Sequence, residues 1–311
     1  MLFTRLISVG NVVVDILATV PALPAPGGDV VASDTGLAAG GSFNVLAAAR
    51  RQGLASAYGG AHGPGPFGGL VRASLAAEGI DVLLPPVDGE DTGWDVALTD
   101  QDGERTFVTA VGAEARLTTG MLGALDVRSS DAVHVSGYGL LREPNRASIT
   151  RWLGALPPEC VVLFDPGPLG GRIDPDVLAV VRRRADWWSG NEAEARAETG
   201  AADAVEAGRM LAATASHGPG GIVVRLGERG CLLVTRAGGV EEIPGFAVTA
   251  VDTNGAGDAH IGAFLAALST GASGADAARR ANAAAALAVS RRGPATAPTA
   301  GELDEFLAAI G

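Results

Sequence analysis

The sequence contains no lysine, because all 23 of its basic residues are arginine. This absence excludes mechanisms that need a lysine ammonium group: a P-loop lysine, a protein-kinase strand lysine and a Schiff base. Cysteine is also scarce. The two residues present, Cys160 and Cys231, each lie in a short apolar run and cannot by themselves build a zinc site or a disulfide framework. We expect both thiols to be buried and reduced.

Positive charge and long apolar runs are scarce as well. Thirty-five acidic residues against 23 arginines give a net charge of −12, so we expect no nucleic-acid partner. No apolar run approaches the ~18 residues that a membrane-spanning helix requires. The N-terminal residues lack the basic segment and small-residue cleavage site of a signal peptide. We therefore expect a soluble cytoplasmic protein without a membrane partner.

The chain alternates short β-rich runs with alanine-rich helical stretches, and 47% of its residues are hydrophobic. Strands separated by helices imply βαβ units and a mostly parallel sheet covered on both faces. The pattern predicts a three-layer α/β fold, with residues 1–311 as one domain. Strands are expected at Leu6–Val9, Ser56–Gly59, Val82–Leu84, Ala132–Ser136, Val161–Asp165, Asp186–Trp188, Ile222–Arg225 and Cys231–Thr235.

Two segments break this alternation, because each contains two β-like runs with no helix between them. The runs are Val12–Leu17 with Asp29–Ser33, and Trp94–Thr99 with Arg105–Ala110. They predict two hairpins in a small separate sheet, a lid over approximately residues 12–35 and 93–111. Extra edge strands on the main sheet are the alternative.

The sharpest motif lies at 252–258 and reads Asp-Thr-Asn-Gly-Ala-Gly-Asp, directly before an apolar helix. The backbone N–H groups of Gly255, Ala256 and Gly257, at the positive end of that helix, predict an anion hole. Asp258 then stands in the first helical turn, where a carboxylate can accept a proton from an attacking hydroxyl. The structural alternative is an acid that only compensates the helix dipole.

This string resembles the C-terminal signature of the PfkB family, the ribokinase-like carbohydrate kinases. The resemblance extends over essentially the whole chain and implies a ribokinase-like fold with a β-sheet lid, ATP as phosphoryl donor and Mg²⁺. It assigns acceptor binding to Asp15, Gly40, Gly41 and Asn44. We add two candidates for the acceptor site: Asn254, a single-residue departure inside the signature, and Tyr138, which follows a strand at the ligand-binding edge. The resemblance assigns nucleotide binding to Asn191, Glu194, Arg225, Gly227 and Asn282.

The resemblance also implies metal sites. Glu194 is expected to act on Mg²⁺ through water, and Asp252 is expected beside a monovalent cation, with potassium as the candidate. Several of these residues have structural alternatives: Asn191 can cap a helix, and Gly40 with Gly41 can form a helix-entry turn. His260, two residues after Asp258, either points into the acceptor site or packs in the core.

One segment departs from the family pattern. Residues 63–68 read Gly-Pro-Gly-Pro-Phe-Gly and lack the two aspartates that the family usually carries there. The same residues match Gly-x-Gly-x-x-Gly, a dinucleotide-binding fingerprint. Pro64 and Pro66 remove two N–H donors from such a loop, which argues against a dehydrogenase.

The sequence thus predicts an ATP-dependent kinase for a hydroxymethyl group of a sugar, sugar derivative or nucleoside. Two alternatives stay open: a phosphosugar kinase that uses Arg105, Arg116 or Arg142, and a catalytically idle binding protein on a kinase scaffold. A homodimer formed through the lid is a further expectation.

Overall fold

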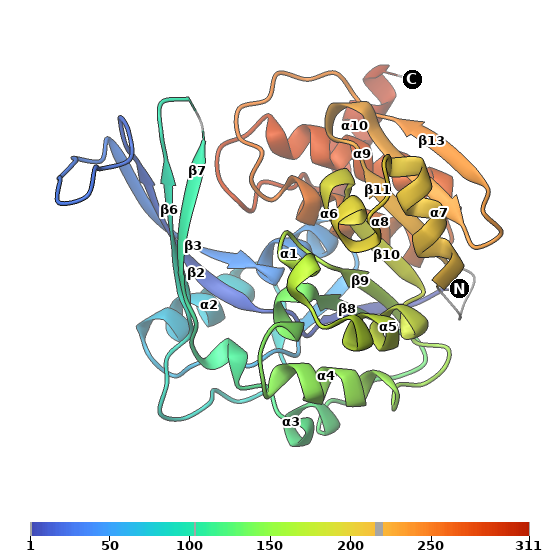
Figure 1. Cartoon of the computed structure of the whole chain (residues 1–311), viewed down its shortest axis with the longest axis horizontal. Helices are drawn as coiled ribbons and strands as arrows, with labels where there is room; N and C mark the ends of the chain where they lie inside the picture. The colour runs from blue at the N-terminus through green and yellow to red at the C-terminus, as the bar shows by residue number, and fades with distance from the viewer. Residues whose placement is uncertain (1, 103, 215–219, 311) are drawn as a thin grey trace.

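The computed structural model describes residues 2–102, 104–214 and 220–310, which form a nine-stranded sheet and a separate four-stranded sheet (Figure 1). The expected layered α/β fold with a lid is therefore confirmed. In the large sheet, neighbours from β5 to β11 are parallel, whereas β12 and β13 are antiparallel. Its spatial order is β13 (Val240–Pro244), β12 (Gly230–Thr235), β11 (Gly221–Arg225), β10 (Trp187–Asn191), β9 (Val161–Asp165), β8 (Asp131–Ser136), β1 (Arg5–Ser8), β4 (Ala55–Tyr58) and β5 (Asp81–Val82).

Helices cover both faces of the large sheet, because side chains on its strands alternate between two apolar cores. In β9, Leu163 packs in one core and Phe164 in the other. The first core is covered by α1 (Ser42–Arg51), α2 (Pro66–Ala77), α8 (Ala256–Ser269), α9 (Gly274–Val289) and α10 (Ala300–Ile310). The second core is covered by α3 (Thr119–Gly123), α4 (Asn145–Leu153), α5 (Pro175–Arg184), α6 (Glu192–Thr199) and α7 (Ala204–Thr214).

Both cysteines are buried free thiols, as the sequence predicts. Among the helices of the described ranges, none combines the length and the apolar character needed to cross a membrane.

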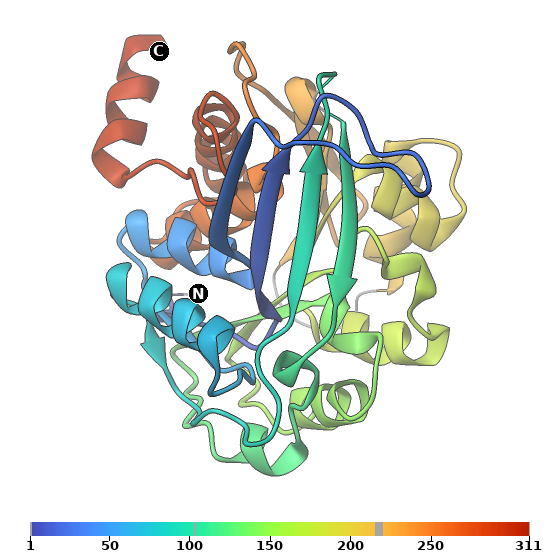
Figure 2. The ribbon, with the colours of Figure 1, turned by 90° about the vertical axis from the view of Figure 1, so that its left-hand side faces the viewer.

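The small sheet stands apart from the layers, at the left of Figure 1, and Figure 2 looks onto its outer face. Its order is β3 (Asp34–Gly41), β2 (Val12–Thr19), β6 (Trp94–Thr99) and β7 (Arg105–Ala110), and we call this sheet the lid. Strands β2 and β6 run parallel, which joins the two expected hairpins into one sheet.

The expected strand over Asp29–Ser33 is wrong, because the partner of β2 is Asp34–Gly41. Residues 29–33 are irregular, and Val31 is 85% exposed. Valines favour strands by intrinsic preference, but pairing with β2 selects the glycine- and alanine-rich run instead. Gly40 and Gly41 consequently end a strand, and Gly41 caps α1. Asp15 lies within β2 rather than at a strand end.

Candidate active site

Parallel α/β sheets bind ligands at the carboxyl ends of their strands, and the expected site residues gather at that edge. Asn191 ends β10, Arg225 ends β11, and Tyr138 lies in a short helical turn directly after β8. Asp165, which ends β9, joins them. Burial raises the pKa of Tyr138, and the negative charge of Asp165 raises it further. The two side chains are therefore near each other.

The N-terminus of α8 lies over this edge. Gly255 is its N-cap residue with φ of 73°, and a Cβ atom there would overlap the carbonyl oxygen of Pro294. Only glycine fits both the left-handed backbone and this close approach. The first amides of a helix have no partner within the helix, so Gly255, Ala256 and Gly257 present the N–H groups expected of an anion hole. Ala256 N–H also makes a long bond of 3.4 Å to the Thr253 carbonyl.

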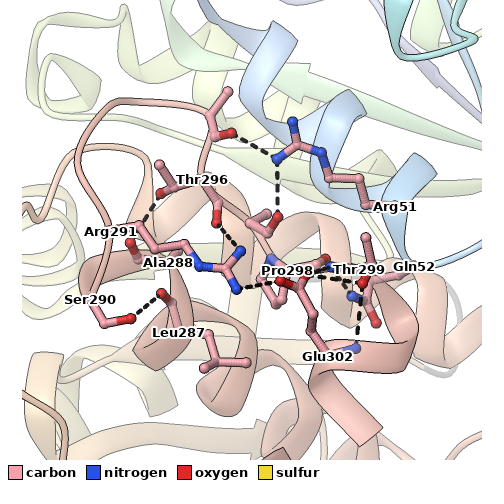
Figure 3. Close-up of polar contacts among 12 residues, drawn as sticks. Arg51, Gln52, Leu287, Ala288, Ser290, Arg291, Thr296, Pro298, Thr299 and Glu302 are labelled. Atoms are coloured by element: carbon pink, nitrogen blue, oxygen red, sulfur yellow. Dashed lines mark hydrogen bonds and ion pairs between the residues drawn. The ribbon is translucent and has the colours of Figure 1, made fainter. Parts of the chain in front are cut away.

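The loop that carries Pro294 is held in place by the end of α1 (Figure 3). Arg51 donates hydrogen bonds to the carbonyls of Ala295 and Ala297, at 2.7 and 3.0 Å, and Gln52 donates one to Pro298 at 2.8 Å. At the start of the loop, Arg291 pairs with Glu302 of α10 at 2.7 Å. These bonds fix residues 291–299 against the helix that also carries Asn44, so α1 supports both sides of the anion hole.

Asp258 stands in the first turn of α8, where Asn44 Nδ2 donates a hydrogen bond of 3.2 Å to its carboxylate. Burial raises the pKa of Asp258 to about 7, and the neighbouring charge of Asp165 acts in the same direction. A carboxylate that titrates near neutral pH is suited to general-base catalysis. The structure thus brings together Asn44, Asp258 and the amides that the sequence analysis singled out.

Arg225 provides positive charge next to these amides. Its guanidinium donates hydrogen bonds to Ser189 Oγ at 3.0 Å and to Glu194 at 3.4 Å. A Cβ atom on Gly257 would lie only 3.3 Å from that guanidinium, so glycine lets Arg225 approach the first turn of α8. Glu194 also closes a capping box with Asn191. The capping interpretation of Asn191 is therefore confirmed, and the cap fixes Glu194 beside Arg225.

The carboxylates of Asp165 and Glu194 fit a magnesium ion that arrives on nucleotide phosphates. Burial raises the pKa of both groups, and the positive charge of Arg225 opposes this shift in each. Magnesium is usually held by one or two carboxylates together with substrate phosphates. No cluster of three or more histidine, cysteine or acidic residues positioned for a metal occurs within the described ranges.

Asp252 does not fit the potassium ion that the resemblance implies. Arg105, on the lid strand β7, forms an ion pair with its carboxylate, and Asn254 and Gly293 donate backbone hydrogen bonds of 2.8 and 3.1 Å. These bonds lower the pKa of Asp252 against the opposing effect of burial. The carboxylate is already compensated by a guanidinium. The pair closes one side of a cleft of about 650 Å³ between the tip of the lid and residues 250–254.

Asp15 projects from the lid toward Asp258. Its carboxylate lies across Gly40, where any Cβ atom would collide with it, so the glycine makes room for the acid. Burial raises the pKa of Asp15 to about 7, and the negative charges of Asp95 and Asp258 act in the same direction. The expected acceptor residues Asp15, Gly40 and Asn44 are therefore close to the general-base candidate.

His260 and Asn282 bond to each other instead of facing a ligand. His260 Nε2 lies 3.1 Å from Asn282 Oδ1, and the histidine is buried beside Phe264. Asn282 Nδ2 donates to the carbonyls of Ile243 and Pro244, at 3.0 and 3.1 Å. Of the two alternatives for His260, the core position is confirmed. Gly227 begins the short helical turn that follows the carboxyl end of β11.

Two of the three arginines considered for a phosphorylated acceptor are engaged in ion pairs. Arg105 pairs with Asp252, Arg116 pairs with Glu90 at 2.7 Å, and Arg142 is exposed. A phosphosugar site built on Arg105 or Arg116 would therefore have to compete with these ion pairs.

The segment 63–68 is not a dinucleotide loop. Asp91 accepts hydrogen bonds of 2.9 Å from the amides of Phe67 and Gly68 and so caps α2 with a carboxylate of the chain itself. That cap occupies the position in which a pyrophosphate would bind.

Three site residues escaped the sequence analysis: Asp165, Ser189 and Asp95. Asp165 had a usable signal, since an acid after the apolar run Val161–Phe164 falls at the ligand-binding edge. Ser189 and Asp95 had none, because both lie inside strands whose facing depends on tertiary packing.

Comparisons with known proteins show the family of the chain. The model for "pfkB family carbohydrate kinase" matches residues 4–300. An uncharacterized sugar kinase of Escherichia coli, YegV, is 34% identical over 95% of this chain and 91% of its own length. A ribokinase of Haemophilus influenzae is 30% identical over 96% of both chains. The crystal structure of a ribokinase from Thermotoga maritima superposes with a TM-score of 0.84 at 25% identity, covering 98% of this chain and 100% of the other.

Proposed function

Because this chain belongs to the pfkB family of carbohydrate kinases and is an ATP-dependent enzyme of that family, we propose that it phosphorylates a hydroxymethyl group with Asp258 as general base. The acceptor is a sugar, a sugar derivative or a nucleoside. The observation that carries the proposal is the position of Asp258: it lies in the first turn of α8 with Asn44 on its carboxylate, directly after three amides that can bind an anion. We keep a cytoplasmic location as part of the proposal, since the reaction consumes ATP.

The reaction needs a proton acceptor and stabilisation of charge on the transferring phosphoryl group. Asp258 takes the proton of the attacking hydroxyl, and Asn44 holds the carboxylate in place. The N–H groups of Gly255, Ala256 and Gly257 bind the developing negative charge, with Arg225 alongside. Such preorganised donors need no rearrangement during the reaction.

The nucleotide side is built around the cap of α6. Asn191 fixes Glu194, and Gly227 leaves the turn after β11 open. Glu194 and Asp165 would hold a magnesium ion bound to the nucleotide, which neutralises phosphate charge when present. Asn282 supports this side by tying α9 to the end of β13. Potassium is not part of the proposal, because Arg105 already compensates Asp252.

The acceptor side is shared between the lid and the large domain. Asp15 and Asn44 bind hydroxyl groups, the backbone at Gly40 and Gly41 allows close approach, and Tyr138, which is 44% exposed, offers an aromatic wall. Asn254 lies on the loop that forms part of the cleft and completes the set. A lid closed over this space excludes water, which would otherwise compete as acceptor.

We also propose that two copies of the chain associate through the outer face of the lid. Leu37 and Val108, both 59% exposed, belong to the face of the lid opposite Asp15 and Asp95, because side chains alternate along a strand. Leu37 pairs with Ile16 and Val108 with Val96 across the strands, so the apolar side chains form one continuous surface.

Asp258→Asn tests the proposed chemistry. The variant keeps the shape of the side chain but removes the base, so we expect ADP production to fall by about 10²-fold or more. ATP affinity, measured by calorimetry, should stay within about twofold because Arg225 and Glu194 are untouched. Asp304→Asn, an exposed acid on α10, is the matched control. Normal turnover in the variant would contradict the role of Asp258, and joint loss of turnover and ATP binding would indicate a structural role.

A further inference from the structure

We propose that Asp95 makes the acceptor site selective for uncharged polyols and amino polyols, by placing a second carboxylate beside Asp15 on the site-facing surface of the lid. The inference rests on the proposed function and names the acceptor class of the same site.

The strand register places the two acids together. In the parallel pair β2–β6, Asp15 is the partner of Asp95, so both side chains emerge on one face of strands about 4.8 Å apart. Asp15 lies over Gly40 on the neighbouring strand β3. The charge of Asp95 acts on both Asp15 and Tyr138, which places it toward the acceptor space.

Neither acid has the hydrogen bonds that a structural carboxylate needs. Asp15 is only 7% exposed and accepts no hydrogen bond from the described part of the chain, and Asp95 Oδ1 is buried without a partner. Other buried acids here are satisfied: Asp131 binds Arg5 at 2.7 Å, and Asp186 accepts from Val162 N–H at 2.8 Å. Since buried polar groups are normally paired, the unpaired oxygens indicate donors supplied by a ligand.

The charges around Asp15 and Asp95 indicate which ligand groups can donate hydrogen bonds to them. Asp258 adds a third carboxylate, and the charge of Arg105, which acts on Asp15, is already shared with Asp252. A carboxylate or phosphate on the acceptor would meet like charge here, which opposes binding. Adjacent hydroxyl groups donate to both acids, and an ammonium group also compensates their charge.

Calorimetric titration of the full chain with a matched panel tests the proposal: a hexose, its 2-amino derivative, the corresponding aldonic acid and the 1-phosphate. We expect the first two to bind and the two anions to bind at least tenfold more weakly. Asp95→Asn should weaken binding of the hexose and the amino sugar about tenfold or more. The difference in affinity between these two ligands and the two anions should become smaller. Affinity for ATP, and acceptor binding by Asp304→Asn, should match the unmodified protein.

Tighter binding of an anion than of its uncharged counterpart overturns the proposal, as does failure of the hexose and amino sugar to bind, or an unchanged affinity profile in Asp95→Asn. If that variant does not fold by circular dichroism, Asp95→Ser is titrated in its place with the same criteria. ADP release measured with the same panel separates the two claims. If only an anionic acceptor is phosphorylated, the kinase function is supported and this inference is overturned. If polyols bind without ADP release, this inference is supported and the kinase function is overturned.

Discussion

At the residue scale, the acids of the site are held differently from the acids of the core. Asp131 and Asp186 are matched with arginines or backbone amides, whereas Asp15 and Asp95 lack donors and Asp258 has one amide group. Such an arrangement is costly for folding, because burial disfavours the ionised form. In these carboxylates, the protonated form therefore favours folding, whereas the ionised form is the one that the proposed function uses.

Asp15→Asn should raise stability at alkaline pH. The pKa of Asp15 is about 7 in the fold, above its ordinary value of 3.8, so its contribution to stability is full below pH 4 and is lost as the pH rises through 7. The amide of asparagine does not ionise, so the variant does not lose this stability. We expect its free energy of unfolding to exceed that of the unmodified protein by on the order of 2 kcal/mol at pH 8, and by less toward pH 4. Urea unfolding at both pH values measures it. A gain that is the same at both values, or a gain in the control Asp304→Asn, would contradict this explanation.

Residues whose proposed role follows from a local motif could be identified from the sequence. Asp258 and its glycines follow from one contiguous string, and Asn44 from a helix start. Arg105 shows where this reasoning fails: its partner Asp252 is 147 positions away, and only the register of the lid brings the two together. Asp95 was likewise invisible, because alternation along a strand does not say which face looks into the site.

At the element scale, α1 joins the two halves of the site. Its first turn carries Asn44, and its last turn carries Arg51, which holds the loop against Gly255 (Figure 3). Helix α8 packs close to α1 because Gly262 has no side chain: a Cβ atom there would lie 2.5 Å from that of Ala48. The distance between Asn44 and Asp258 is thus set by this helix pair.

Arg51→Met should loosen the loop over residues 291–299. The variant keeps an apolar stem but leaves the Ala295 and Ala297 carbonyls without their donor, so we expect a loss of about 1–3 kcal/mol in stability. We also expect kcat to fall several-fold, since Pro294 no longer fixes Gly255. Arg50→Met, on the exposed side of the same turn, should cost less than about 0.5 kcal/mol. Thermal unfolding and steady-state kinetics compare them, and equal behaviour of both variants would refute the positioning role of Arg51.

The strands expected in the large sheet could be predicted to within two residues, because short apolar runs between turns mark buried strands. The exception among them is the expected strand Asp186–Trp188, which the structure has as Trp187–Asn191. The strand β3 could not be predicted, because Asp34–Gly41 carries few β-favouring residues and is a strand only through its ladder with β2. The edge strand β13 was missed for a related reason: its sequence, Val-Glu-Glu-Ile-Pro, is stabilised by pairing with β12 at the rim of the sheet.

At the scale of the whole molecule, the lid exposes an apolar sheet face that a second copy would cover. A sheet with one open apolar face is a common site of self-association. The alternation of the sequence predicted that the lid is a separate sheet, but not which of its faces remains open, since that depends on how β2 and β6 cross the large domain.

The purified protein should be a dimer in multi-angle light scattering. Leu37→Asp places a charge in the proposed interface and should yield monomers, whereas Val31→Asp, on the irregular segment before β3, should leave the dimer intact. A monomeric unmodified protein, or dimers that persist in Leu37→Asp, would show that the face has another role.

The ion pair between Arg105 and Asp252 has a consequence for the timing of turnover. It spans the lid and the loop before α8, and both side chains are largely shielded from solvent, at 20% and 15% exposure. Opening of the lid separates these two charges, and lid opening sets the pace of many enzymes. We therefore expect the residence time of a product to depend on this one contact between the lid and the loop before α8.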